Sequence, residues 1–270
     1  MEKQLIWREK KLHYALNGWG PAVVLLHPYL ASHRVWDSLT EVFKDQFTVV
    51  AVDLPGFGQS DVFAESHSMS FMAEAVKAVM DHENIVKAVM VGHSMGGYMS
   101  LAFAEQFPDR LNGLVLFHSQ AAADTPEARE NRMRSIEVVK NGHKNYSNKF
   151  LPDLFADENK VVLADQIQSL CKEAENISPE GIIAVLRGMA ERKDYRLLLK
   201  RLNIPVLFVA GKNDPRIPLD VITQQMQMPR DSEAILIDNV GHMGQFEAPD
   251  KIFPVLESFC ERAHIQKGNK

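Results

Sequence analysis

Short apolar runs alternate with amphipathic segments over much of the chain. The runs are rich in Val, Ile, Leu, Ala and Phe, and they occupy residues 22–26, 47–52, 88–91, 111–117 and 205–210. This composition and length are typical of strands that are covered on both faces of a parallel sheet. Residues 71–81, after Ser70, and residues 95–107, before Pro108, carry apolar positions at helical spacing. The alternation predicts an α/β fold whose mostly parallel central sheet is flanked by helices.

The alternation is interrupted in the second half of the chain. Residues 121–202 contain no strand-like run. Within them, Thr-Pro-Glu at 125–127 and Ser-Pro-Glu at 178–180 each have the pattern of a helix-capping residue, a first-turn proline and an acid. We therefore expect a core formed by residues 1–120 and 203–270, with residues 121–202 inserted as a helical cap, or lid.

Both ends of the chain also predict regular structure. Residues 5–7 and 11–16 indicate a hairpin or a pair of edge strands before the Gly-Trp-Gly-Pro turn at 18–21. Residues 234–237 predict the last strand, and residues 251–262 the closing helix. The strand–helix alternation thus resumes after the insertion.

The composition argues against several classes of function. The chain has 270 residues, of which 46% are hydrophobic and 24% charged, and its formal net charge is −5. This charge offers no basic surface for nucleic acid or for an anionic membrane. No apolar run reaches the ~18 residues that a membrane span needs. The two isolated cysteines, Cys171 and Cys260, and an N-terminus without a signal-peptide pattern indicate a cytoplasmic protein, whose oligomeric state the sequence does not address.

Residues 91–97, Val-Gly-His-Ser-Met-Gly-Gly, carry the strongest chemical signal. They contain the pattern Gly-x-Ser-x-Gly around Ser94, where a predicted buried strand turns directly into a helix. A nucleophile elbow requires that context, because small residues two before and two after the serine let strand and helix approach closely. The N-terminus of the helix supplies unpaired N–H groups and the positive end of its dipole. Ser94 is therefore the predicted nucleophile, and an incidental serine in a glycine-rich turn is the alternative.

With this motif the chain resembles the α/β-hydrolase family, in its capped branch with a serine nucleophile. The resemblance covers nearly the whole chain. Besides the elbow it is carried, in the family's order, by Leu-Leu-His-Pro-Tyr-Leu at 25–30, Asp-Leu-Pro-Gly-Phe-Gly-Gln-Ser-Asp at 53–61, Gly-Lys-Asn-Asp-Pro-Arg-Ile-Pro at 211–218 and Gly-His-Met-Gly-Gln-Phe-Glu-Ala-Pro at 241–249.

The resemblance implies a Ser-His-Asp triad. The family's chain order is serine, acid and histidine, and Asp214 and His242 match the last two, each just after a predicted strand. Taken alone, Asp214 would also suit a turn before Pro215, and His242 would suit a surface loop. Asp53 and Asp61 are expected only to fix their Pro-Gly-Phe-Gly turn.

The resemblance also implies an oxyanion hole. The common family form after the first core strand is His-Gly-x, in which x donates its N–H. Here x corresponds to Tyr29, and the residue after the nucleophile, Met95, supplies the second donor. Pro28 occupies the glycine position, whose own N–H is not the donor, so it fixes φ without removing a needed group. His27 is expected to be a buried hydrogen-bonding residue and His93 to be packed away from the reaction.

The substrate pocket is less well defined by the sequence. Candidate lining residues are His118, Gln120, Phe155, Leu186 and Met189, the last three from the expected cap. Asp124 is expected to cap a helix. The cap resembles that of 3-oxoadipate enol-lactonases, which implies a cationic clamp. The candidates are Arg129, Arg132, Arg187 and Arg216, although a solvated helix face or turn is the favoured interpretation for each.

The expected function is that of a serine hydrolase that cleaves a small carboxylic ester or lactone through an acyl-enzyme. No cofactor is required, and the histidines show no metal-ligand spacing, so no metal is expected. Enol-lactone hydrolysis, C–C bond hydrolysis and haloperoxidase-like perhydrolysis share the triad and remain alternatives within the fold. A non-catalytic ligand-binding receptor is the alternative from a different class.

Overall fold

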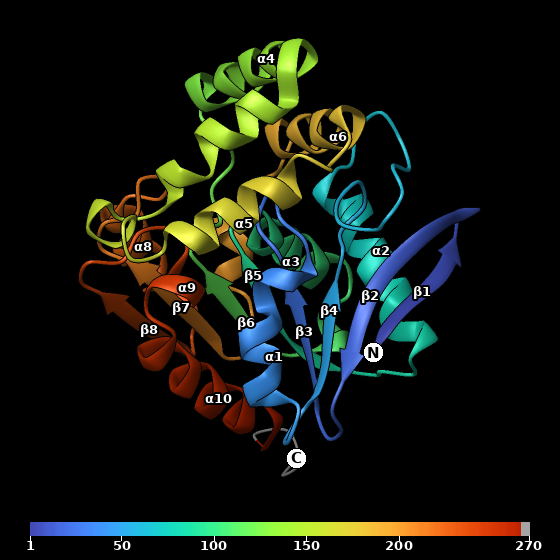
Figure 1. Ribbon diagram of the computed structural model, residues 1–270. Coiled ribbons are helices and arrows are strands. Elements are labelled where there is room, and N and C mark those ends of the chain that lie inside the picture. Colours follow the sequence, from blue (N-terminus) through green and yellow to red (C-terminus); the bar gives the residue numbers. More distant parts are fainter. Residues whose placement is uncertain (266–270) are drawn as a thin grey trace.

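An eight-stranded sheet forms the centre of the computed structural model (Figure 1), which describes residues 1–265. The strand order is β1-β2-β4-β3-β5-β6-β7-β8. The first two strands form an antiparallel hairpin at one edge, β2 pairs antiparallel with β4, and all strands from β4 to β8 in the sheet run parallel. The strands are β1 (Glu2–Trp7), β2 (Lys10–Asn17), β3 (Ala22–Leu26), β4 (Thr48–Val52), β5 (Ala88–His93), β6 (Leu111–Phe117), β7 (Val206–Gly211) and β8 (Ser232–Ile237). The predicted fold class is confirmed.

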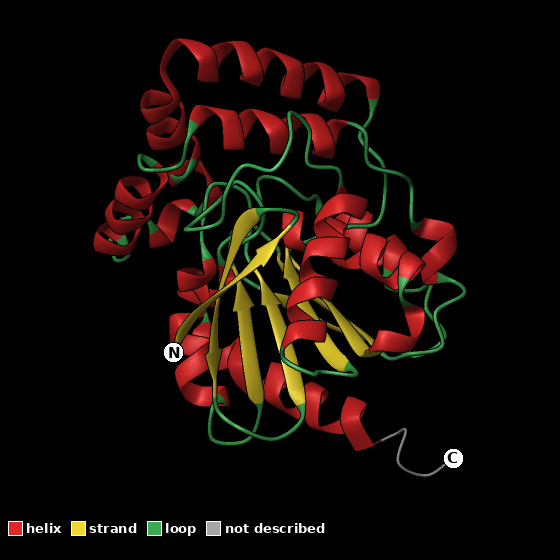
Figure 2. Ribbon diagram, turned by 90° about the vertical axis from the view of Figure 1, so that its right-hand side faces the viewer, coloured by secondary structure: helices red, strands yellow, loops and turns green. Residues whose placement is uncertain are grey.

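Helices cover both faces of this sheet (Figure 2). The C-terminal helix α10 contacts β5, β6 and α1 on one face, whereas α2 and α3 pack together on the other, where α3 also contacts β5 and β6. The core helices are α1 (Asp37–Phe43), α2 (Met69–His82), α3 (Met95–Gln106), α8 (Leu219–Gln225), α9 (Gly244–Glu247) and α10 (Pro249–Ile265), with 3-10 turns η1 (His33–Trp36) and η2 (Pro108–Arg110). One cap differs from expectation: α2 begins two residues earlier, because Ser68 rather than Ser70 accepts a hydrogen bond from the Phe71 N–H.

All the regular secondary structure between β6 and β7 is helical. Residues 121–202, all of which the structure describes, contain helices and no strand. These are α4 (Pro126–Phe150), η3 (Pro152–Leu154), η4 (Asp157–Asn159), α5 (Ala164–Ala174), α6 (Pro179–Ala190) and α7 (Arg196–Leu199). Both α4 and α6, which contact each other, lie beyond the carboxyl ends of the parallel strands (Figures 1 and 2). The expected core segment 203–270 includes residues 266–270, which lie outside the described range.

His67 connects the core to α6. Its ring accepts hydrogen bonds from the N–H groups of Phe63 and Ala64 and bonds through Nδ1 to the Pro55 carbonyl. Its own N–H donates to the Ala184 carbonyl in α6. At Gly188 a Cβ atom would lie 1.8 Å from the His67 oxygen, so only glycine permits this approach.

His27 plays a similar part at the end of β3. Its Nε2 accepts the Leu54 N–H at 3.0 Å, and its Nδ1 lies 2.8 Å from the Pro28 carbonyl oxygen. The ring is completely buried. Because Nε2 accepts, Nδ1 carries the proton, and the neutral ring holds the turn at Pro28 against the start of the loop after β4. This is the hydrogen-bonding role expected for His27.

These two histidines predict that mild acid destabilises the fold. Burial lowers the pKa of both His27 and His67 from 6.5 to about 4. Such a group stays neutral when folded and takes a proton near pH 6.5 when unfolded. Its contribution to stability is therefore complete above pH 6.5 and is lost as the pH falls toward 4. We expect the free energy of unfolding, measured by chemical denaturation, to fall by about 2 kcal/mol per histidine between about pH 7 and pH 4.5.

The variant His67→Gln should show a smaller drop over this interval, even where its stability at neutral pH is lower. The matched control is His82→Gln, because His82 is exposed in the last turn of α2. An equal loss of stability in the wild type and in His67→Gln would contradict the assignment.

Candidate active site

Ser94 occupies a strained turn between β5 and α3. Its φ of 52° and ψ of −110° lie in a region that residues with side chains rarely adopt. The neighbouring glycines make the turn possible: a Cβ atom at Gly92 would lie 2.4 Å from Ser100 Oγ, and one at Gly96 would lie 2.5 Å from the Leu26 oxygen. The glycine pattern thus has the structural role that the motif implied, and it presents the serine at the carboxyl edge of the sheet.

His242 and Asp214 are joined by a hydrogen bond. Histidine Nδ1 lies 2.8 Å from Asp214 Oδ2, and the other carboxylate oxygen accepts the N–H groups of Arg216 and Ile217 at 2.8 and 3.0 Å. Burial alone would raise the pKa of Asp214, but the charges and hydrogen bonds of His242 and His118 hold it well below its usual range. An ionised Asp214 accepts from Nδ1–H, which leaves Nε2 of His242 with its lone pair.

The backbone of His242 is fixed from two sides. Its N–H donates to the Leu154 carbonyl at 2.7 Å, and its carbonyl lies 2.8 Å from His93 Nε2. Burial, reinforced by the neighbouring His242 and His118, lowers the pKa of His93 well below its usual value. His93 is therefore a neutral donor that positions the loop carrying His242, a more specific role than the packing expected for it.

A cavity of about 370 Å³ connects these groups. Ser94 and His242 both line it, and among the described residues no hydrogen bond joins their side chains. Of the pocket residues named from sequence, Gln120, Leu186 and Met189 also line the cavity. Its volume is typical of a site for a small molecule.

His118 and Phe155 lie elsewhere. The His118 ring is completely buried, and its Nδ1 lies 3.2 Å from Asp214 Oδ2, because the strand end of β6 directs it behind the carboxylate. Phe155 is buried against Phe246, with ring centroids 6.4 Å apart. Neither lines the cavity that contains Ser94, so their placement as pocket residues is corrected.

Two backbone N–H groups beside Ser94 are unpaired. Within the described part of the chain, neither the Tyr29 nor the Met95 amide has a hydrogen-bond partner. Tyr29 lines the cavity, and Met95 is the first residue of α3. The Tyr29 amide follows Pro28, whose carbonyl is held by His27. Unpaired amides next to a serine are available to an anionic oxygen.

Three arginines line the same cavity. Arg132 and Arg192 both bond to Asp124, whose side chain is only 3% exposed, whereas Arg216 stacks on the Phe150 ring, 4.3 Å from its centroid, without a carboxylate partner among the described side chains. Two expectations are corrected here. Asp124 does not cap a helix, since α4 is capped by Thr125, as the Thr-Pro-Glu pattern predicted, and Arg132 lies in the cavity rather than on a solvated helix face.

The remaining candidate arginines face away. Arg129 donates to the Ala190 carbonyl, and Arg187 donates to the Glu65 carbonyl. Arg192, by contrast, was not among the residues predicted from the sequence, although it stacks on Tyr98 at 4.1 Å and lines the cavity. No local pattern marks it, since it lies in the turn after α6.

The described residues also contain two clusters whose ligand atoms lie close enough to hold a metal ion. One is the site itself, His118, Asp214 and His242, where both Nδ1 atoms are engaged with the Asp214 carboxylate. The other consists of Glu2, His13 and His33 at the edge of the sheet. No helix in the described range is both long and apolar enough to cross a membrane.

The chain is similar to several known hydrolases. The chain is 27% identical to 3-oxoadipate enol-lactonase 1 of Acinetobacter baylyi, over 93% of this chain and 94% of that protein. It is 23% identical to an (E)-2-((N-methylformamido)methylene)succinate hydrolase of the same organism, over 92% and 94%. Among solved structures, a malate-bound thermophilic esterase from Thermogutta terrifontis is similar, with a TM-score of 0.91, 29% identity, and 98% and 99% of the two chains covered. The family model for the alpha/beta hydrolase fold matches residues 21–249, and the chain belongs to that family.

Proposed function

We propose that this hydrolase cleaves a carboxylic ester or lactone with Ser94 as nucleophile, His242 as general base and Asp214 as the residue that orients the base. The observation that carries the proposal is the shared cavity: it is lined by Ser94, by the Asp214-bound His242 and by Tyr29. Among the described residues the Tyr29 N–H is unpaired, as is that of Met95, which follows Ser94 in the chain. A non-catalytic receptor has no need of this combination.

In the proposed reaction, Ser94 Oγ attacks the acyl carbonyl carbon and passes its proton to His242 Nε2. The Tyr29 and Met95 N–H groups stabilise the resulting oxyanion. His242 then returns the proton to the leaving oxygen, which gives an alcohol, or the enol of a ring-opened lactone, and an ester on Ser94. Water, deprotonated by the same histidine, releases the acid and restores the serine.

The helical segment 121–202 is proposed to act as the cap over this reaction. Arg132 of α4 and Leu186 and Met189 of α6 line the cavity together with Ser94. Contacts such as Gly188 with His67 hold α6 to the core, so the cap excludes water as a packed layer rather than a mobile loop.

The charge of the cavity supports a substrate that itself carries an acidic group. Among the described residues that line it, Arg132, Arg192 and Arg216 face only one ionised acid, Asp124. The pKa of that acid lies below its usual value: burial opposes this, but Arg132 and Arg192 stabilise the carboxylate. The excess of positive charge suits a carboxylate. Two of the similar enzymes are named for a succinate and an oxoadipate, which supports the same substrate class.

Replacement of Ser94 tests the chemistry. Ser94→Ala should reduce hydrolysis of p-nitrophenyl acetate and butyrate by about a thousandfold or more, because no nucleophile remains. A fluorophosphonate probe should label the wild type at Ser94 and fail to label the variant. The control is Ser258→Ala, an exposed serine on α10. Full esterase activity in Ser94→Ala, or a probe adduct at another serine, would refute the mechanism.

His93 is predicted to act by positioning His242. His93→Leu removes the donor to the His242 carbonyl, so kcat should fall about tenfold or more with little change in KM. His93→Gln retains an N–H donor of similar reach and should recover part of the loss. Thermal unfolding of both variants, compared with the kinetics, separates positioning from stability. A rise in KM at unchanged kcat in His93→Leu would contradict the role.

Arg216 is predicted to select acidic substrates. Arg216→Gln should raise KM for a lactone or ester bearing a free carboxylate about tenfold to a hundredfold, since it loses one charge-assisted contact. The methyl ester of the same compound should be affected little. Arg187→Gln is the matched control, because that side chain lies outside the cavity. Equal effects on the charged and the esterified substrate would exclude carboxylate recognition by Arg216.

A further inference from the structure

A second group of histidines is hydrogen-bonded to Asp53, and none of these bonds involves Ser94, Asp214 or His242. Its carboxylate is completely buried and accepts the Nδ1–H groups of His13 and His33 at 2.8 and 2.9 Å. It also accepts the backbone N–H groups of His33 and Gln59, at 2.8 and 2.9 Å. The Asp53 carboxylate thus accepts four hydrogen bonds, which favour its ionised form. An ionised Asp53 can only accept, so Nδ1 is the donor in both rings.

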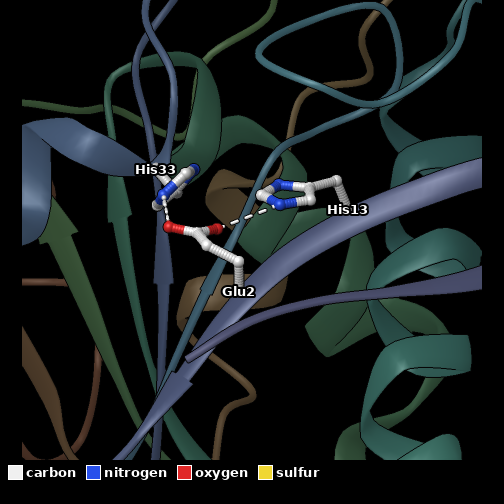
Figure 3. Close-up of side chains that lie close together, drawn as sticks. All are labelled: Glu2, His13 and His33. Carbon is white, nitrogen blue, oxygen red and sulfur yellow. Dashed lines mark ion pairs between the residues drawn. The ribbon is translucent and has the colours of Figure 1, made fainter.

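The opposite nitrogens of the two rings converge on one more carboxylate. Figure 3 shows Glu2 between them, with its oxygens 2.9 Å from His13 Nε2 and 3.3 Å from His33 Nε2. A neutral ring that donates through Nδ1 has a lone pair on Nε2, and a carboxylate oxygen also presents only lone pairs. When both rings are neutral, three acceptors face one another, and a cation between them satisfies all three.

The register of the hairpin produces this convergence. Glu2 in β1 pairs with Ala15 of β2, so it is the diagonal neighbour of His13 on the same face of the sheet. His33 arrives from the loop after β3, at the start of η1. The two rings are nearly buried, with side chains 5% and 4% exposed, whereas the Glu2 side chain is 55% exposed and opens the cluster to solvent.

We propose that Glu2, His13 and His33 form a binding site for a divalent cation of the zinc type, held by the two Nε2 atoms and the Glu2 carboxylate. Two imidazoles and one carboxylate are a ligand set that zinc prefers and that calcium and magnesium do not. The ligand atoms all lie within 4.8 Å of one another.

The dimensions fit a cation after a small adjustment. Zinc bonds of about 2.0–2.1 Å place tetrahedral ligand atoms about 3.4 Å apart, a few tenths more than the spacings to Glu2. The exposed Glu2 side chain can move outward by this amount, and solvent can supply the fourth ligand. Asp53 fixes both rings through their Nδ1–H groups, which is the support that metal-binding histidines commonly have.

The charge of the carboxylates around the two rings also favours a divalent cation. Two carboxylates meet the rings, with Asp53 at their Nδ1 atoms and Glu2 at their Nε2 atoms. A divalent cation balances the pair of carboxylates. It would also tie the edge hairpin to the loop that begins with Pro28 and Tyr29, since His33 belongs to that loop.

Zinc titration of the full chain, stripped of metal and in competition with a chromogenic chelator near neutral pH, tests the site. We expect one zinc ion per chain and a rise in the unfolding temperature on saturation. Glu2→Gln should weaken zinc binding at least tenfold and abolish the thermal shift, without changing esterase activity in the absence of zinc. Glu9→Gln, which changes an exposed acid in the turn of the same hairpin, is the matched control and should bind as the wild type does.

A second variant distinguishes this cluster from the site at Ser94. His242→Ala removes a histidine from the other candidate cluster and should leave the zinc affinity unchanged. X-ray absorption at the zinc edge should show two imidazole ligands. The proposal is overturned if the wild type binds no zinc, in which case a proton shared with Glu2 occupies the cluster, or if zinc binding survives Glu2→Gln and is lost in His242→Ala.

Discussion

The parallel arrangement of the central strands is the constraint on which the site depends. When neighbouring strands run in the same direction, their carboxyl ends meet at one edge of the sheet. Tyr29 follows β3, Ser94 follows β5, Asp214 follows β7 and His242 follows β8. These residues are distant in the chain, and the sheet brings them to one edge, where Tyr29, Ser94 and His242 line one cavity and Asp214 bonds to His242. The helical segment between β6 and β7 leaves at this edge, and its Arg132, Leu186 and Met189 line the cavity before the chain returns to the amino end of β7.

Two buried aspartates use the same chemistry for different purposes. Asp53 and Asp214 each follow a parallel strand, and each accepts hydrogen bonds from two histidine rings. In both places burial would favour the neutral acid, and the ring N–H donors keep it ionised. At Asp214 this orients one imidazole toward a cavity. At Asp53 it orients two imidazoles toward the Glu2 carboxylate and, through the His33 and Gln59 amides, fixes the loops after β3 and β4.

Sequence patterns could predict what depends on local chemistry. The apolar runs predicted the parallel strands because strands covered on both faces leave little room for polar residues, and the glycines around Ser94 predicted the elbow because only small residues fit there. Strand ends differ from the prediction by one to three residues, as for β5, which continues to His93. Pairing with β6 determines that boundary, and pairing is not visible in a single segment.

The side-chain partners that cross between elements could not be predicted. The direction of the chain at the end of β6 determines whether the His118 side chain faces the cavity or Asp214. His118 has a left-handed φ of 43°, which turns the chain there and leaves its ring beside Asp214. The cluster of Glu2, His13 and His33 has no ligand spacing along the chain, because strand register and a loop from β3 create it. The place of Arg192 in the cavity likewise depends on its contacts with Asp124 and Tyr98, which are distant from it in the chain.

Asp124 explains how the cavity can hold so much positive charge. A guanidinium buried without a partner is strongly unfavourable, and removal of one member of a buried ion pair is more destabilising than the pair is stabilising. Asp124 is shared by Arg132 and Arg192, so each arginine has a partner while the group as a whole keeps one positive charge. Two arginines of the helical segment thus share one acid, and one positive charge remains beside that of Arg216 among the residues that line the cavity. A fully paired cluster would lack this excess charge, on which the proposed recognition of an acidic substrate depends.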